Sequence, residues 1–370
     1  MSEPVERLRV ELDERSYDIL VGRGLIARAG AEMLPVMRRR QAIVVTDTTV
    51  AERHLAPLLA SLDAAGIARH TIVLPPGEAT KDLAHFGRLV DEALQCGIER
   101  GTMLVALGGG VVGDITGLAA ATLLRGLDFV QLPTTLLAQV DSSVGGKTAI
   151  NTAAGKNLLG AFYQPRLVLA DTGALATLPR REMLAGYAEV VKYGLIADAA
   201  FFDWLEAEGG LVCEGEAAAL RRAVLTSCRM KAEIVAEDER ETGDARALLN
   251  FGHTFGHALE AETGFGDALL HGEAVALGMV LAFDFAVRLG LASGQDAVRV
   301  RRHLAAIGLP TELRAVGLAG RAEALLAHMA KDKKVRDGRI TLILPRRIGN
   351  ARVMRDAAAD ALRGFLAEAA

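Results

Sequence analysis

The residues best suited to metal chemistry in this chain are histidines in its second half. Three of the eight histidines lie within residues 250–271. His253 and His257 are four residues apart, a spacing that places both rings on one face of a helix. His271 follows at the expected start of another helix. Imidazole nitrogens are common zinc ligands, so this segment is a candidate metal site.

A carboxylate and an ammonium group are expected to be buried on another helix. Glu189 and Lys192 are three residues apart on a face that also carries apolar residues, so both charges are drawn towards the interior. An unpaired buried charge is costly, and a cation or ligand relieves that cost. Two imidazoles and one carboxylate form a common open zinc site. Glu189 and the three histidines are four candidates for three places, and spacing does not decide which histidine stays out. A pair of core or surface histidines is the alternative.

A glycine-rich segment in the first half is suited to phosphate. Gly108–Asp114 places Gly-x-Gly-x-x-Gly between an expected strand and helix, where backbone N–H groups can approach a pyrophosphate. A tight turn that only packs the helix on the strand is the alternative. The acidic residue that binds the adenosine ribose must then come from the end of an earlier strand. Asp47 is the candidate, and a helix N-cap is the alternative role for this residue. Pro76–Lys81 follows the next expected strand and offers another acid and a lysine at the same edge of the sheet. A solvated turn is the alternative interpretation of this segment.

A polar block follows in the middle of the chain. Asp141–Asn151 and Gly155–Gly160 are rich in Gly, Lys, Asn and hydroxyl residues, and Lys147 and Lys156 are flanked by glycines. Such lysines are suited to phosphate or carboxylate oxygens, so the block is interpreted as a ligand loop rather than a plain long loop. Arg125 stands at an expected helix end, where it could cap the helix or reach a ligand in this or a neighbouring subunit.

The hydrophobic pattern of the first half predicts a mainly parallel sheet covered by helices, because short β-branched runs alternate with amphipathic segments. Strands are expected at Ala42–Thr46, Thr71–Leu74, Met103–Leu107 and Phe129–Leu132. Helices are expected at Thr49–Ala65 and Lys81–Cys96. Leu8–Leu12 and Tyr17–Val21 are expected to form an added antiparallel pair.

The pattern changes after Leu178-Pro179, where long Ala, Leu, Glu and Arg segments begin. Helices are expected at Arg181–Ile196, Glu216–Glu237, Ala247–Glu262, Glu273–Leu289, Arg299–Ala306 and Arg321–Lys331, with a short strand at Arg339–Leu344. The sequence therefore predicts an α/β N-terminal domain with a Rossmann-like sheet over residues 1–178 and an all-α C-terminal domain over residues 179–370.

Composition argues against several classes of protein. The 370 residues carry a formal net charge of −4 without a basic block, which argues against nucleic-acid binding. An apolar content of 51% is too high for a disordered chain. Three cysteines, without metal-like spacing, favour a reducing compartment over a disulfide framework. The sequence shows no signal-like start and no uninterrupted apolar run of ~20 residues, so we expect a cytoplasmic protein without a membrane partner.

Several blocks of these residues occur together in one order. They are Pro76-Gly77-Glu78 with Lys81, Gly108–Asp114, Arg125-Gly126, Pro133–Lys147, Gly155–Gly160, Ala188–Lys192, Asn250–His257, His271–Glu273 and Asp332–Lys334. The series resembles the 3-dehydroquinate synthase family, sugar phosphate cyclases of the shikimate pathway. The match runs from about Asp47 to Ile340, and the series is far more specific than any one block.

The resemblance implies an NAD-binding N-terminal domain and a C-terminal domain for metal and substrate. It implies that a divalent metal, zinc or alternatively cobalt, is held by Glu189, His253 and His271. It implies that NAD is held by Asp47, Pro76, Gly77, Glu78, Ala79, Thr80, Lys81, Gly110, Val111, Val112, Gly113, Asp114, Thr134, Thr135, Lys147, Lys156, Ala174, Leu175, Ala176 and Thr177. Substrate is then contacted by Asp141, Lys147, Asn157, Lys192, Lys231, Arg246, Asn250, His257 and Lys333, with Lys334 as the alternative to Lys333. Arg125 is expected to come from a partner subunit, which implies a homodimer.

The implied reaction converts 3-deoxy-D-arabino-heptulosonate 7-phosphate to 3-dehydroquinate and phosphate, which makes the enzyme a carbon–oxygen lyase. Its steps are metal-assisted transient oxidation with NAD, β-elimination of phosphate, re-reduction, ring opening and intramolecular aldol closure. A substrate with a carboxylate and a phosphate needs cationic contacts, and the lysines and Arg246 named above supply them.

Three other classes of protein fit part of the pattern. Another sugar phosphate cyclase, such as a deoxyinosose or valiolone synthase, is one, although Arg246, Asn250 and Lys333 favour a substrate with a carboxylate. A metal-dependent polyol dehydrogenase of the glycerol dehydrogenase type would release NADH as product and is not expected to carry Asp141–Lys147 or Gly155–Gly160. An NAD-sensing protein would have little reason to keep both a metal set and a cationic pocket.

Overall fold

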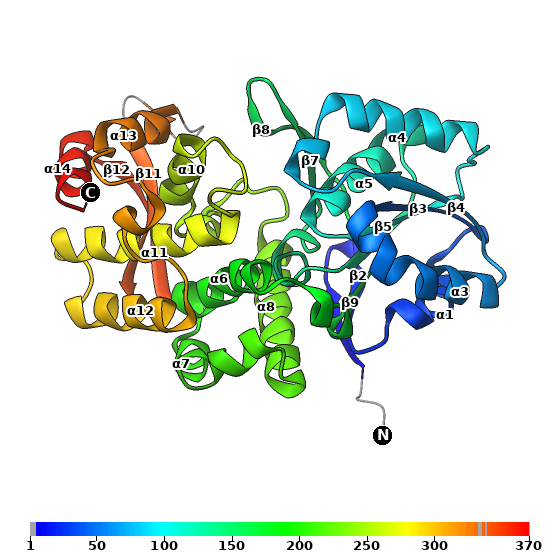
Figure 1. Cartoon of the computed structure of the whole chain (residues 1–370), viewed down its shortest axis with the longest axis horizontal. Helices are drawn as coiled ribbons and strands as arrows, with labels where there is room; N and C mark the ends of the chain where they lie inside the picture. Colours follow the sequence, from blue (N-terminus) through cyan, green and yellow to red (C-terminus); the bar gives the residue numbers. More distant parts are fainter. Residues whose placement is uncertain (1–4, 332–334, 337–338, 370) are drawn as a thin grey trace. The chain divides into compact units, whose positions relative to one another are not determined.

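The computed structural model describes residues 5–331, 335–336 and 339–369 (Figure 1). By their contacts the residues form two compact units, each with its own core. The first unit is Met1–Pro179 with Leu220–Arg240, and the second is Arg180–Ala219 with Glu241–Ala370. Leu220–Arg240 therefore belongs with the first unit, although its Ala- and Arg-rich sequence is typical of the helical half.

A seven-stranded sheet forms the centre of the first unit, with the order β1-β2-β9-β6-β5-β3-β4. Its strands are β1 (Glu6–Val10), β2 (Tyr17–Gly22), β3 (Gln41–Asp47), β4 (Ala68–Leu74), β5 (Met103–Gly108), β6 (Phe129–Pro133) and β9 (Leu167–Asp171). β1 is antiparallel to β2, and the other neighbours are parallel. The predicted α/β fold with a mainly parallel sheet and an added antiparallel pair is confirmed, although β1 begins at Glu6 rather than Leu8.

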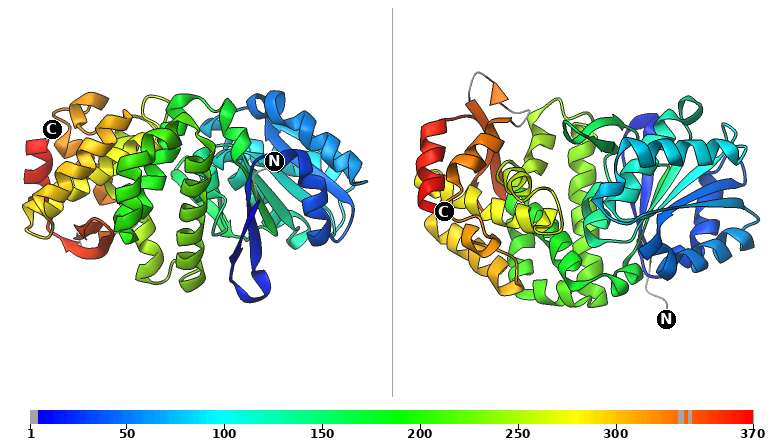
Figure 2. Two further views of the ribbon diagram at one scale, coloured as in Figure 1. Left: turned by 90° about the horizontal axis from the view of Figure 1, so that it is seen from below. Right: turned by 45° about the horizontal axis from the view of Figure 1, so that its top comes forward.

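Helices cover both faces of this sheet (Figures 1 and 2). They are α1 (Ala29–Met33), α2 (Thr48–Val50), α3 (Ala56–Ala64), α4 (Leu83–Gln95) and α5 (Gly110–Thr122), and most of α8 (Ala217–Glu237) also belongs to this unit. On β3, Ala42 and Val44 pack in the cluster that includes α1 and α3, whereas Ile43 and Val45 pack in the cluster that includes α4 and α5. Burial on both faces explains why these strands are continuous apolar runs.

A two-stranded hairpin projects from the first unit and is formed by β7 (Lys147–Thr152) and β8 (Gly155–Phe162) (Figure 1). The sequence predicts a ligand loop at these residues. The structure forms a β-hairpin there rather than a loop, and the binding of a ligand by these residues stays a prediction. Thr148 and Ile150 are buried and alternate with more exposed neighbours, which is a strand pattern. Most of β8 is exposed, so its glycines and polar residues conceal the strand in the sequence.

The second unit is mainly helical, as predicted, and it also contains a small antiparallel sheet. Its helices are α6 (Arg180–Ala197), α7 (Ala199–Glu214), α9 (Asp244–Ala247), α10 (His253–Glu262), α11 (His271–Arg288), α12 (Gly294–Ile307), α13 (Ala322–Lys331) and α14 (Ala359–Ala369). The expected strand at Arg339–Leu344 is β11 (Arg339–Arg347), which lies between β10 (Val335–Arg336) and β12 (Asn350–Ala357). The predicted helix Ala247–Glu262 is interrupted because Gly252, with a φ of +79°, is the N-cap of α10.

Helix α11 is the core of the second unit and packs against α6, α10, α12 and β11. Glycines allow the helices to approach closely. A Cβ on Gly272 would lie 1.9 Å from the carbonyl oxygen of Ala185 on α6. A Cβ on Gly278 would lie 2.1 Å from the carbonyl oxygen of Gly252. These contacts fix the first turn of α11 against α6, and a point about two turns further along α11 against the start of α10. None of the helices in the described part of the chain is long and apolar enough to cross a membrane.

Candidate active site

The predicted cofactor residues of the first unit lie at one edge of its sheet. The parallel strands β3, β4, β5, β6 and β9 have their carboxyl ends at this edge. The predicted residues follow them in turn: Asp47 ends β3, and Pro76–Lys81, Gly110–Asp114, Thr134-Thr135 and Ala174–Thr177 come after β4, β5, β6 and β9. From β3 the chain continues to β4 on one side, and from β5 it continues to β6 on the other. Open α/β sheets bind ligands at such a switch point.

The glycine loop between β5 and α5 leaves the first N–H groups of α5 without a side-chain cap. The N-cap of α5 is Gly109, which provides no side-chain acceptor for the N–H groups of the first turn. A Cβ on Gly110 would lie 3.0 Å from Oγ of Ser142. The hydroxyls of Thr134 and Ser142 are buried without a hydrogen-bond partner among the residues that the structure describes. Buried hydroxyls of this kind fit a polar ligand, so the loop fits a dinucleotide. Ser142 belongs to the predicted polar block but not to the predicted cofactor residues, and the structure makes it an additional candidate for this role.

Lys81 connects the loop after β4 to α5 and to the hairpin. Its side chain is almost fully buried, and Nζ lies 2.5 Å from Oδ2 of Asp114 and 2.6 Å from Oδ1 of Asn157. Burial lowers the pKa of Lys81, but the carboxylates of Asp114 and Glu78 outweigh burial and raise the pKa above its ordinary value. Lys81 therefore stays charged. Asn157 has a φ of +55°, a left-handed conformation that Asn tolerates better than most residues.

Two other predicted residues of the first unit are a helix N-cap, Asp47, and a residue with a left-handed backbone, Arg125. Asp47 caps α2 and accepts a hydrogen bond from the Val50 N–H at 2.9 Å, which is the alternative that the sequence left open. Arg125 is exposed, and both it and Leu124 have left-handed backbones, with φ of 67° and 49°. Such conformations cost about 1–2 kcal/mol each and cluster at functional sites.

The predicted substrate residues Asp141 and Lys231 form an ion pair in the first unit. Lys231, on α8, is 6% exposed and also donates to the carbonyl oxygen of Asp141 at 2.6 Å. The remaining predicted lysines lie on the hairpin, where Lys147 begins β7 and Lys156 is near the start of β8.

The second unit brings the three predicted metal ligands together. Nε2 of His253 and Nε2 of His271 each lie 3.6 Å from Oε1 of Glu189. One potential ligand atom from each of these residues lies within 4.8 Å of the other two. His257 shares the face of α10 with His253, as predicted, but its ring is exposed and lies outside this set. Of the four candidates that the sequence left open, the geometry therefore groups Glu189 with His253 and His271.

The outer ring nitrogens of both histidines face acceptors. Nδ1 of His253 lies 3.1 Å from the carbonyl oxygen of Phe251. Nδ1 of His271 lies 3.0 Å from Oε2 of Glu260, a residue of α10 that is 3% exposed. An acceptor at Nδ1 holds the ring proton there and leaves the lone pair of Nε2 for a metal. Glu260 was not predicted, although it lies about two turns beyond His253 on the same face of α10.

The charges of this set fit a divalent cation. Glu189 is 0% exposed and pairs with Lys192, which is 1% exposed, so the predicted burial of both charges is confirmed. Burial and the nearby Lys192 ammonium lower the pKa of His253 well below its ordinary value and keep the ring neutral, the form that binds metal. Burial also lowers the pKa of His271, but the carboxylates of Glu189 and Glu260 outweigh burial and raise it to about 10. The two carboxylates thus favour a positive charge at this position, which suits a bound metal cation.

The other predicted substrate residues of the second unit differ in surroundings. The Arg246 side chain on α9 is 1% exposed, and Nδ2 of Asn250 donates to Oε1 of Glu241 at 2.8 Å. Lys333 and its alternative Lys334 lie outside the described residues.

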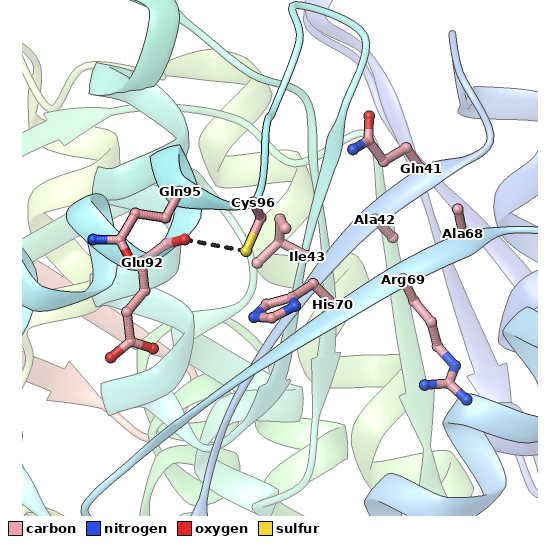
Figure 3. Close-up of a pocket in the computed structure, with 9 residues that line it drawn as sticks. All are labelled: Gln41, Ala42, Ile43, Ala68, Arg69, His70, Glu92, Gln95 and Cys96. Carbon is pink, nitrogen blue, oxygen red and sulfur yellow. Dashed lines mark hydrogen bonds between the residues drawn. The ribbon is translucent and has the colours of Figure 1, made fainter.

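The first unit also contains a cavity of about 450 Å³ (Figure 3). This cavity lies away from the edge of the seven-stranded sheet that carries the predicted cofactor residues. It is lined by residues at the beginning of β3 and β4, such as Gln41 and Arg69, and by the end of α4 with Cys96. These are the amino ends of parallel strands, whereas open α/β sheets bind ligands at the carboxyl ends. This cavity is therefore not the candidate site.

Comparison with known proteins decides the family. The N-terminal model of 3-dehydroquinate synthase matches residues 71–185, and the C-terminal model matches residues 186–335. This chain belongs to the 3-dehydroquinate synthase family. A curated relative from Rhodospirillum rubrum, named 3-dehydroquinate synthase, is 63% identical over 95% of this chain and 91% of its own length. The resemblance that the sequence blocks indicate is thereby confirmed.

Two solved sugar phosphate cyclases share the fold. The 2-epi-5-epi-valiolone synthase of Streptomyces hygroscopicus, with NAD+ and Zn2+ bound, has a TM-score of 0.86 and 32% identity, and the match covers 97% of this chain and 98% of that one. A 2-deoxy-scyllo-inosose synthase complexed with carbaglucose-6-phosphate, NAD+ and Co2+ has a TM-score of 0.86 and 26% identity, over 99% of this chain and 100% of that one.

Proposed function

We propose that this protein catalyses the 3-dehydroquinate synthase reaction, in which 3-deoxy-D-arabino-heptulosonate 7-phosphate is converted to 3-dehydroquinate and phosphate. The observation that carries the proposal is the convergence of His253 and His271 on Glu189, beside the buried Lys192, in a chain of this family. Expulsion of phosphate makes the enzyme a carbon–oxygen lyase.

The cofactors that we propose are NAD and a divalent metal, zinc or cobalt, which two related cyclases contain. We assign the metal to Glu189, His253 and His271. We assign NAD to residues 1–178, at the sheet edge that carries the glycine loop, and substrate and metal binding mainly to residues 179–370. When bound, the metal acidifies neighbouring substrate hydroxyls and NAD accepts and returns a hydride.

The side chains around these cofactors bind and orient the substrate. Lys192 places a buried positive charge beside Glu189, where it holds an anionic oxygen of the substrate. The buried guanidinium of Arg246, together with Asn250, is suited to the substrate carboxylate. The exposed ring of His257, next to His253, is placed to hold or move a substrate proton. Further substrate contacts that we propose are Asp141, Asn157, Lys231 and Lys333.

We also propose that the enzyme works in the cytoplasm as a homodimer. All three cysteines are free, which suits a reducing compartment. The strained, exposed Arg125 is suited to reach the site of a second copy, and a contact of this kind requires at least a dimer.

The experiment that tests the function is phosphate release from 3-deoxy-D-arabino-heptulosonate 7-phosphate with zinc and catalytic NAD, while NADH absorbance is followed. We expect many phosphates per NAD without accumulation of NADH. Absence of phosphate release from folded, metal-loaded protein would contradict the proposal, and other sugar phosphates would be tried next. NADH that accumulates in step with polyol oxidation would identify a dehydrogenase instead.

A further inference from the structure

Asn151 joins the hairpin to the loop that follows β4. Its backbone N–H donates to the carbonyl oxygen of Lys81 at 2.7 Å. Its Nδ2 donates to Oε1 of Glu78 at 2.7 Å, and its Oδ1 accepts from the N–H of Asn157 at 3.0 Å. Both ends of the amide are thus in use. Among the common side chains, an amide is suited to donate to a carboxylate while it accepts from a backbone N–H.

The partners of Asn151 are residues that the proposed function uses. Glu78 and Lys81 belong to the proposed NAD loop, and Asn157 is a proposed substrate contact. Lys81 closes the network, because its Nζ lies 2.6 Å from Oδ1 of Asn157 and 2.5 Å from Oδ2 of Asp114. The hairpin and the NAD loop are therefore connected by several hydrogen bonds that include charged partners, which are the stronger kind.

Apolar packing does little to fix the part of the hairpin that carries Asn157. Leu158, Leu159 and Phe162 on β8 are 40%, 43% and 45% exposed. A segment with few buried apolar contacts opens easily, so its position depends on its polar contacts. Asn157 also has a left-handed backbone that needs to be held, and the bond from its N–H to Asn151 holds it.

We propose that Asn151 is a positioning residue that couples the NAD loop to the substrate side of the hairpin. It orients the Glu78 carboxylate for the cofactor and holds Asn157 against Lys81. Coupling of this kind is reciprocal, so a cofactor that orders Glu78 and Lys81 also orders the hairpin. The proposal rests on the proposed function, because it takes Glu78 and Lys81 as cofactor contacts.

The first test needs neither cofactor nor turnover. Hydrogen exchange of the backbone amides of residues 155–160 is compared in full-length wild-type protein, Asn151→Ala and Thr152→Ala. Thr152 is the matched control, because its hydroxyl accepts from the Ala154 N–H at 3.3 Å within the hairpin turn. We expect at least about tenfold faster exchange in Asn151→Ala, as loss of bonds to a charged group predicts, and near wild-type exchange in Thr152→Ala. Equal exchange in Asn151→Ala and wild type would overturn the proposal.

A second test uses the polarity of the bond between Asn151 and Glu78. Asn151→Asp sets two carboxylates against each other and should also open the hairpin. In the double variant Asn151→Asp with Glu78→Gln, the new amide can donate to the new carboxylate, so we expect slower exchange than in Asn151→Asp alone. No recovery in the double variant would show that this bond does not hold the hairpin.

The third test concerns the coupling itself. We expect Asn151→Ala to raise both the Kd for NAD, measured by titration, and the KM for 3-deoxy-D-arabino-heptulosonate 7-phosphate by about tenfold, with a smaller effect on kcat. Unchanged values with wild-type turnover would overturn the coupling. If the wild-type enzyme releases no phosphate, the proposed function fails, while the exchange measured without cofactor still decides the role of Asn151.

Discussion

Nδ1 of His271 lies 3.0 Å from Oε2 of Glu260, while Nε2 of the same ring faces Oε1 of Glu189. The imidazole is thus held between two buried carboxylates, one on α6 and one on α10. A carboxylate behind a histidine fixes the orientation of the ring and makes its other nitrogen a stronger metal ligand. Glu260 therefore belongs to the proposed metal site although it does not reach the metal position itself.

Glu260→Gln keeps the shape of this side chain and removes its charge. We expect a metal affinity about 10- to 100-fold weaker, measured by competition with a chelator. Glu262→Gln is the matched control, because Glu262 is on the same helix and also contacts a histidine, His328, at 3.0 Å, outside the metal set. Its metal affinity should stay at the wild-type value. An unchanged affinity in Glu260→Gln would remove Glu260 from the site.

His253→Ala removes one of the three proposed ligands. Metal content and activity should be lost together, because Glu189 and His271 alone are a poor site for zinc. His257→Ala should keep its metal and lose turnover, since its ring lies outside the set. Metal analysis of the purified variants, alongside phosphate release, checks both. A His253→Ala protein with full metal content would refute the assignment, and a His257→Ala protein without metal would exchange the roles of the two histidines.

Lys192→Ala separates binding of metal from turnover. The metal ligands remain, and a bound cation compensates the buried Glu189 carboxylate, so the fold and the metal content should be retained. Turnover should fall by about 100-fold or more, the range seen for loss of a positioned acid–base group. Circular dichroism, metal analysis and kcat are measured on one preparation. Near wild-type turnover would exclude Lys192 from the site.

The sequence predicts the parallel strands because their burial on both faces leaves continuous apolar runs, as in β3 and β5. It predicts the burial of Glu189 and Lys192 because an apolar helix face carries both. It does not predict α7, where Gly209 and Gly210 interrupt the helical pattern. The structure explains Gly209 by tertiary packing, since a Cβ there would lie 1.9 Å from Oη of Tyr187.

The contacts that complete the candidate site were beyond prediction from spacing. Glu260 meets His271 across two helices, and Asn151 meets Glu78 across two segments far apart in the chain. Such pairs depend on how α10 packs on α11 and where the hairpin folds. Local pattern shows which residues share one face of an element, but it does not show which faces meet.

Gly272→Ala tests whether close helix packing positions the metal site. A Cβ there would lie 1.9 Å from the backbone oxygen of Ala185, so the first turn of α11, with His271, must move away from α6. We expect a loss of unfolding free energy of about 1–3 kcal/mol or more, together with weaker metal binding. Gly210→Ala is the control, because this exposed residue of α7 has no atom within 4 Å of the added Cβ. It should stabilise the protein by about 0.5–1 kcal/mol and leave metal binding unchanged. Wild-type metal affinity in Gly272→Ala would show that the close approach is not required.

His303 makes the stability of the second unit sensitive to acid. Its Nε2 lies 2.9 Å from Oη of Tyr187, and burial lowers its pKa, opposed in part by Glu206. In the unfolded chain the histidine pKa is about 6.5, so below that pH the unfolded state binds more protons than the folded state. The stability that the neutral ring contributes is therefore present above about pH 6.5 and is lost as pH falls towards the lower pKa of the folded protein.

His303→Gln keeps a hydrogen-bonding group next to Tyr187 and removes the titration. Urea unfolding at pH 7, 6 and 5 should show a smaller loss of unfolding free energy in this variant than in wild type. The exposed His70→Gln serves as the control and should follow the wild-type curve. Because wild type and variant share the same metal site, the difference between their curves reports on His303 alone. If the curves of wild type and His303→Gln are parallel from pH 7 to pH 5, His303 does not cause the acid sensitivity. The contact with Tyr187 then does not favour the neutral form of the ring.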